Sequence, residues 1–231
     1  MIATDQFIYV HLHKSGGTFV NECLMRFFPR ARRLGYHLPR SMIPTALQDL
    51  PVVGFVRSPW SYYVSWYAFQ SQMAQPNVLF RCMSENQSLD FSGTVRNLLD
   101  LGSSERKLDR LLQRLPTSYG DQGLNLPAFA LAPIRGSGSG FYSYLYRYMY
   151  SGDRSRLVVG RAENLRHDFL DFLVGLGSAV APPLRNFILN ETPRNVSCHE
   201  AYRNYYDDRL AALVAERDHA IIETFDYRFD D

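Results

Sequence analysis

The feature that most constrains the fold is an apolar run that passes through a Gly-Gly pair into a segment with helical spacing. Residues 7–12 (Phe-Ile-Tyr-Val-His-Leu) are rich in β-forming residues and predict a buried strand. Residues 19–28 carry apolar side chains at helical spacing and end before Pro29. The intervening His13-Lys-Ser-Gly-Gly-Thr18 predicts a tight turn. A strand, a turn and a helix in this order predict the opening of an α/β fold.

The same alternation continues along the chain. Ser58-Pro59 follows a buried strand at 51–56 and predicts a helix start, because Ser caps a first turn and Pro fits the first helical position. Further strands are predicted at 33–36 and 156–160, and further helices at 60–73, 141–150, 165–176 and 199–225. This order predicts a three-layer α/β/α fold with a central parallel sheet. In such sheets the ligand lies at the carboxyl ends of the strands.

Length and composition suit one domain without a membrane or nucleic-acid partner. The 231 residues are predicted to form a single domain, residues 1–231, in which 75–139 is the least regular part. A net charge of +2 is too small to indicate nucleic-acid binding. No apolar run approaches the ~20 residues of a membrane span, and Asp5 leads into the first strand without a signal-peptide pattern. Three widely spaced cysteines predict neither a disulfide framework nor a zinc site, so we expect a cytoplasmic protein.

Aromatic residues make up 14% of the chain, and many of them gather at 60–69 and 141–150. Such clusters either line a pocket for an acceptor molecule or pack in the core. Core packing is the interpretation that we prefer for most of these residues, because buried aromatic rings contribute large apolar areas.

The first turn has the composition of an anion site. Gly16 and Gly17 allow left-handed backbone and a close approach of phosphate, and a helix N-terminus favours negative charge. Lys14 reaches the same anion, and Ser15 and Thr18 add hydroxyl donors. The Walker loop is a poor fit, because its Lys follows the glycines whereas Lys14 precedes them. A tight turn without a ligand is an equally good interpretation of this loop alone.

A second candidate element joins Arg57, at the end of a buried strand, to Ser65, eight residues later in the predicted helix. Arg offers a planar fork to a phosphate, and a Ser two turns into the helix faces back toward the same site. For an isolated pair, an Arg bound to a carboxylate and a Ser on a helix face would be the preferred interpretation.

Together the two elements resemble the PAPS-dependent sulfotransferases, whose donor is 3′-phosphoadenosine-5′-phosphosulfate. His13-Lys-Ser-Gly-Gly-Thr18 resembles their 5′-phosphosulfate loop, and Val53-Gly-Phe-Val-Arg-Ser-Pro-Trp-Ser-Tyr-Tyr-Val-Ser65 resembles their 3′-phosphate motif. Gly35-Tyr-His-Leu-Pro39 is similar to the segment that carries the catalytic His in the cytosolic branch. Val158-Val-Gly-Arg-Ala-Glu-Asn-Leu165 and Phe225-Asp-Tyr-Arg-Phe229 look like parts of the carbohydrate branch.

The resemblance implies a P-loop-like strand–loop–helix that binds PAPS and releases PAP, with no metal. It assigns Lys14 to the leaving group and His37 to the acceptor proton, as general base. The residues that it assigns to the donor phosphates are Lys14, Ser15, Gly16, Gly17, Thr18 and Phe19 for the 5′-phosphate and Arg57 and Ser65 for the 3′-phosphate. Glu163 is a second candidate base, although a structural hydrogen-bonding group below the site is the preferred interpretation. The resemblance is weak across 75–139, where family members differ in acceptor binding.

Two departures from the family pattern stand out. The late Arg-Lys-Gly loop that holds the 3′-phosphate in the cytosolic branch is not found, and Arg194 is the candidate to replace it. Gly35 stands where that branch has a Lys before its catalytic His. The other histidines, at positions 11, 13, 167, 199 and 219, are interpreted as mainly structural, although His13 adjoins the loop.

Several alternatives stay open at this point. The acceptor is a hydroxyl or amine of a small molecule or a carbohydrate, and a homodimer remains an option. One rival is a P-loop-like nucleotide kinase or NTPase, which needs a Mg²⁺ site and usually a strand-end Asp. The other is a non-catalytic module of the same fold that binds PAP or a glycan.

Overall fold

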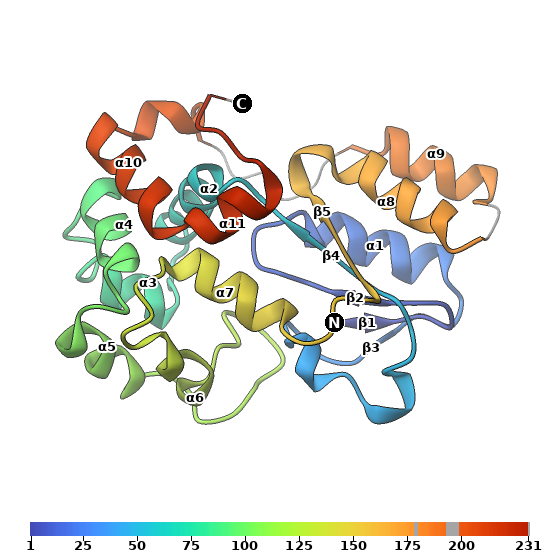
Figure 1. Ribbon diagram of the computed structural model, residues 1–231, viewed down its shortest axis with the longest axis horizontal. Helices are drawn as coiled ribbons and strands as arrows, with labels where there is room; N and C mark the ends of the chain where they lie inside the picture. The colour runs from blue at the N-terminus through green and yellow to red at the C-terminus, as the bar shows by residue number, and fades with distance from the viewer. Residues whose placement is uncertain (178–179, 193–198, 231) are drawn as a thin grey trace. The chain divides into compact units, whose positions relative to one another are not determined.

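The computed structural model describes residues 1–177, 180–192 and 199–230. It has an α/β fold with one five-stranded mixed sheet, and eleven α-helices lie within these residues (Figure 1). Its contacts divide the chain into two compact units, each formed by two segments. Unit 1 comprises Met1–Arg57 and Met149–Val196, and unit 2 comprises Ser58–Tyr148 and Ser197–Asp231.

The sheet belongs to unit 1. Its strands are β1 (Ile2–Ala3), β2 (Ile8–Val10), β3 (Arg32–Arg33), β4 (Val52–Val56) and β5 (Leu157–Arg161), in the spatial order β3-β1-β2-β4-β5. β2, β4 and β5 are parallel, as predicted. The prediction of a wholly parallel sheet is wrong at the other edge, where β1 pairs antiparallel with both β2 and β3. The four residues between β1 and β2 are too few for the crossover that parallel pairing requires, so these strands form a hairpin.

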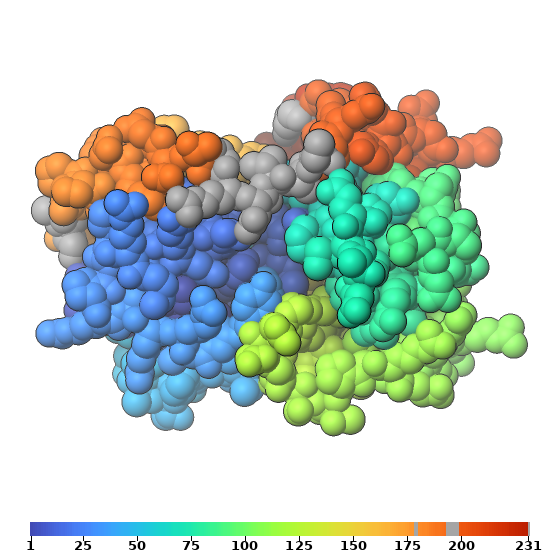
Figure 2. Space-filling view, turned by 180° about the vertical axis from the view of Figure 1, so that it is seen from behind, coloured from blue at the N-terminus to red at the C-terminus, as the bar shows by residue number. Residues whose placement is uncertain are grey.

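One face of the sheet is covered by α1 (Gly17–Phe27), α8 (Leu165–Gly175) and α9 (Pro182–Asn190) (Figure 1). Figure 2 shows α9 lying against the α1 segment on the surface. Alternate residues of the strands, Tyr9, Val53 and Phe55, face this layer, as the period of two along a strand requires. The helices contribute the other side chains of the core, among them Phe19, Val20, Cys23, Leu24, Phe169, Phe172, Phe187 and Ile188.

The opposite face of β4 is occupied by Tyr150, the last residue of α7 (Phe141–Tyr150) and a member of unit 1. The backbone N–H of Phe55 donates to Tyr150 Oη at 3.1 Å, and Tyr150 Oη lies 3.2 Å from the carbonyl oxygen of Val10. A Cβ on Gly54 would lie 2.3 Å from Tyr150 Oη. Gly54 is therefore the strand residue that lets a buried phenol bridge β2 and β4.

Unit 2 is helical. Its elements are α2 (Pro59–Ser71), α3 (Val78–Met83), α4 (Phe91–Leu99), α5 (Glu105–Leu112), α6 (Ala128–Leu131), most of α7, α10 (Asp208–Arg217) and α11 (His219–Phe225). The prediction of one long helix over 199–225 is wrong, because the chain breaks at Asp218. The buried Asp218 carboxylate accepts hydrogen bonds from Tyr63 Oη at 2.6 Å and from the Ser143 N–H at 2.7 Å. Such a carboxylate caps the start of α7 from the α10–α11 junction.

Core packing of the aromatic clusters is confirmed for several residues of α2 and α7. Trp60, Tyr62, Tyr63 and Tyr142 are all buried, and the rings of Tyr62 and Tyr142 stack with their centroids 3.7 Å apart. Within the described residues, every helix is too short or too polar to cross a lipid bilayer.

Candidate functional site

The loop between β2 and α1 turns the chain sharply before the helix begins. Lys14 and Gly16 both adopt left-handed backbone, with φ of 59° and 78°. Gly16 is the N-cap of α1, and its carbonyl oxygen accepts from the Phe19 N–H at 3.2 Å. The ring of Phe19 is buried and stacks on Phe187 at 5.6 Å, so Phe19 contributes to the core as well as to the first turn. The result is an eleven-residue helix whose N-terminus opens directly at the loop.

Close contacts within unit 1 leave little room for a side chain at either glycine. A Cβ on Gly17 would lie 1.6 Å from His11 Nε2, and one on Gly16 would lie 2.8 Å from Leu165 Cδ1. Gly17 therefore lets the His11 imidazole rest directly on the first residue of the helix. Gly17 is thus needed for this contact with His11 and not only for the turn.

Two cationic side chains belong to this loop and to the end of β4. Arg57 Nη1 donates to the main-chain carbonyl of Lys14 at 3.5 Å, and both side chains are half-buried. Burial, and next the Arg57 cation, lower the pKa of Lys14 from 10.5 to about 8. Ser15 is buried and its Oγ donates to the carbonyl of His13 at 3.3 Å, whereas Thr18 is exposed. Lys14 thus stays mostly charged at pH 7 but at a free-energy cost that an anion would relieve.

Three imidazoles form a cluster against the loop. The His37 ring stacks on that of His13 with centroids 3.7 Å apart and planes 14° apart, and lies 4.2 Å from that of His11. Nδ1 of His37 lies 2.8 Å from the His11 carbonyl oxygen. Since a carbonyl only accepts, Nδ1 must carry the proton, and the lone pair of the neutral ring is on Nε2. This is the tautomer that a general base needs at Nε2.

Burial and a neighbouring imidazole favour the neutral form of His11 and His37. Burial first, and the neighbouring His13 second, lower the pKa of both His11 and His37 well below 6.5. His37 also has left-handed backbone with φ 47°, a conformation that costs a non-glycine residue about 1 kcal/mol or more. A strained, buried and neutral imidazole is a common signature of a functional position.

The remaining predicted residues lie elsewhere. Ser65 is buried in α2 of unit 2, whereas Arg57 ends the first segment of unit 1. Arg194 lies outside the described residues. Glu163 is exposed on the turn after β5. It is therefore not a buried hydrogen-bonding group below the site. Among the residues that the structure describes, no three His, Cys, Asp or Glu side chains are grouped so that they could hold a metal ion.

Two contributors to the site were not singled out from the sequence. His11 was interpreted as structural, yet its ring supports Gly17 and its carbonyl fixes the His37 tautomer. Tyr150 bridges the two strands that lead to the loop and to Arg57. A Gly inside the strand 51–56 was the available signal for Tyr150, because a strand glycine often marks a close approach.

Comparison with known proteins adds no assignment: no protein-family model matches the sequence, and no curated protein matches it.

Proposed function

We propose that the chain is a sulfotransferase that transfers the sulfuryl group of PAPS to a hydroxyl or amine of a small-molecule or carbohydrate acceptor. The observation that carries the proposal is the meeting of two kinds of group at one loop. Lys14 and Arg57 bring positive charge to a helix N-terminus, and His37 brings a neutral imidazole with its lone pair on Nε2. Together they supply anion binding and proton acceptance, which sulfuryl transfer needs at the same place.

The loop chemistry fits a donor with several phosphate oxygens. The strand, the loop and α1 act as a P-loop-like cradle, in which amides at the start of α1 and the Lys14 ammonium hold the 5′-phosphate. Gly16 supplies the left-handed turn of the cradle, and Gly17 makes room for the His11 ring beside it. Arg57 is the group of the loop region that we assign to the 3′-phosphate, and the resemblance adds Ser65 and Arg194 as candidates. This 3′-phosphate is what distinguishes PAPS from ATP.

The reaction is an in-line displacement at sulfur. The acceptor oxygen or nitrogen forms a bond to sulfur while the bond from sulfur to the 5′-phosphate oxygen breaks. The electron pair of the broken bond stays on that oxygen, where Lys14 stabilises the charge. The acceptor proton goes to His37 Nε2, and PAP is the second product. Positioning and electrostatics supply the rate enhancement, and no covalent enzyme intermediate is required.

The first test is calorimetric titration with PAP, using ADP as the control because it lacks the 3′-phosphate. We expect PAP to bind with a micromolar Kd and ADP to bind at least about tenfold more weakly. This ratio corresponds to the free energy that hydrogen bonds to a charged group usually contribute. Arg57→Ala should weaken PAP binding about 10- to 100-fold. Arg185→Ala removes an exposed arginine of α9 as the matched control and should leave PAP binding unchanged.

The opposite results would redirect the assignment. Equal binding of PAP and ADP would mean that no 3′-phosphate is read, and Mg²⁺-dependent turnover of ATP would then favour a nucleotide kinase or NTPase. Tight PAP binding without sulfation of any acceptor would favour a non-catalytic module of the same fold.

A further inference from the structure

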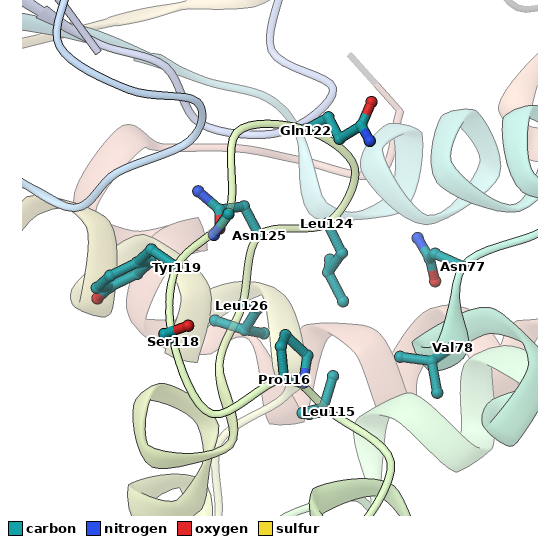
Figure 3. A pocket seen from close by; sticks show the side chains of 11 residues that line it. Asn77, Val78, Leu115, Pro116, Ser118, Tyr119, Gln122, Leu124, Asn125 and Leu126 are labelled. Atoms are coloured by element: carbon teal, nitrogen blue, oxygen red, sulfur yellow. The ribbon is translucent and has the colours of Figure 1, made fainter.

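Unit 2 contains a pocket of about 360 Å³, which lies within the range of small-molecule sites. Figure 3 shows the start of α3, with Asn77 and Val78, on one side of the pocket and the loop between α5 and α6 on the other. The loop contributes residues from the 115–126 segment. This segment falls in the part of the chain where the sequence shows the least regularity.

The lining of the pocket is uncharged and combines apolar with neutral polar side chains. Its apolar side chains are those of Val78, Leu115, Pro116, Leu124 and Leu126. None of the 11 residues that line it is Asp, Glu, Lys, Arg or His. A charged ligand would lose its hydration there without gaining an opposite charge, whereas an apolar ligand would gain from leaving water. The lining therefore selects for neutral compounds.

Asn77 is a polar residue of the lining with a hydrogen-bond donor left for a ligand. Asn77 caps α3, because its Oδ1 accepts from the Phe80 N–H at 2.9 Å, and its own N–H donates to Gln70 Oε1 at 2.8 Å. These bonds hold the carboxamide in place, and no acceptor for Asn77 Nδ2 is present among the described residues. Asn77 can thus donate to a ligand without giving up its capping role.

The loop on the other side is held by its own contacts. Asn125, with left-handed backbone at φ 45°, accepts from the Gly120 N–H at 2.6 Å. The hydroxyl groups of Tyr119 and Tyr148 are hydrogen-bonded to each other, which anchors the Tyr119 ring at the pocket. A pocket with a fixed wall costs a ligand less ordering entropy than one that must form on binding.

We infer that this pocket binds a neutral, mainly apolar small molecule that presents a hydrogen-bond acceptor to Asn77 Nδ2. The inference concerns unit 2 alone and does not depend on sulfuryl transfer.

The test is calorimetric titration of the whole chain with 2-naphthol and with 2-naphthoate, which keeps the two rings but adds a negative charge. We expect 2-naphthol to bind with a Kd on the order of 100 µM and 2-naphthoate to bind at least about tenfold more weakly. Leu124→Asp places a charge in the pocket and should weaken 2-naphthol binding about tenfold or more. Leu112→Asp makes the same change at a half-buried leucine of α5 outside the pocket, and should not.

Three results would overturn the inference: 2-naphthoate binding as tightly as 2-naphthol, no saturation by millimolar 2-naphthol, or Leu124→Asp binding like the unaltered chain. If circular dichroism shows that Leu124→Asp does not fold, Val78→Trp takes its place. That substitution fills the pocket from the start of α3 and should abolish 2-naphthol binding. PAP titration of the same samples keeps the two proposals separate, since neither variant alters the β2–α1 loop.

Discussion

The contact between Gly17 and His11 predicts a strong energetic coupling within the proposed donor site. Gly17→Ala places a Cβ 1.6 Å from His11 Nε2, whereas real contacts of this kind do not fall below 3.0 Å. The His11 ring is buried between Tyr9, at a centroid distance of 5.8 Å, and His37, at 4.2 Å. The ring therefore has to move by well over 1 Å in a place where neighbouring rings occupy the space.

The magnitude follows from overpacking. Forcing extra volume into a packed core costs about 1–3 kcal/mol, and we expect Gly17→Ala to lower the free energy of unfolding by that amount. The backbone itself does not oppose Ala, because Gly17 lies in α1 with ordinary negative φ. In a His11→Ala background the obstruction is gone, and Gly17→Ala should be neutral or stabilising by up to about 0.5 kcal/mol through its helix preference.

The assay is a double-mutant cycle by urea unfolding of the unaltered chain, Gly17→Ala, His11→Ala and the double variant. The expected coupling energy is about 1–3 kcal/mol, with the sign that makes the second substitution rescue the first. Additive effects would refute the reasoning, because they would mean that the His11 ring does not rest on Gly17.

The other predictions concern the imidazole cluster and the strand pair beneath it. His37→Ala should remove sulfuryl transfer, measured by PAP release, while calorimetry still finds PAP binding; retained turnover would refute its role as base. Folding lowers the pKa of His11 and His37 below 6.5, so the unfolded chain binds more protons than the folded chain. The free energy of unfolding should therefore fall as the pH drops below about 6.5. His37→Gln should make this dependence of the unfolding free energy on pH less steep. Gly54→Ala should destabilise by about 1–3 kcal/mol in thermal unfolding, since its Cβ would meet Tyr150; an unchanged Tm would contradict the bridge between β2 and β4.

The sequence predicts the central parallel strands well, because each is a run of β-forming residues long enough to show a pattern. β4 and β5 lie where expected, and α1 follows the Gly-Gly turn. The two-residue strand β1 could not be predicted, since two residues carry no periodicity and its pairing depends on partners distant in the chain. The strand predicted at 33–36 overlaps β3 (Arg32–Arg33) only at Arg33. The same limitation explains the missed break at Asp218, whose partners Tyr63 and Ser143 come from other helices.

The candidate site was predicted in part for a related reason. Lys14 and Arg57 each follow a strand, so parallel pairing of β2 and β4 brings them to the same edge of the sheet. The place of His37 beside His13 depends instead on the path of an irregular segment, for which only the resemblance gave an indication. The His11 contact with Gly17 required coordinates, because nothing in the sequence fixes the direction of that ring.

The lowered pKa of Lys14 gives the donor site a pH dependence with a definite sign. An ordinary lysine keeps its charge to about pH 10, but Lys14 titrates near pH 8 because burial and the Arg57 cation disfavour its charged form. An anion binds the charged form better, so its affinity must fall as pH rises through about 8, by up to about tenfold per pH unit. The phosphates of PAP keep their charge in this range, since their last pKa is about 6.

Calorimetric titration of PAP between pH 7 and pH 10 measures this dependence directly. We expect PAP affinity to fall above pH 8 in the unaltered chain and to stay level to pH 10 in Lys14→Arg, whose guanidinium does not lose its proton. A level profile in the unaltered chain would show that the Lys14 ammonium does not contact the anion, and the cradle would then rest on Arg57 and the amides of α1 alone. A fall that persists in Lys14→Arg would assign the titration to another group. Only a fall in PAP affinity that Lys14→Arg abolishes would show that the Lys14 ammonium contacts the bound phosphate.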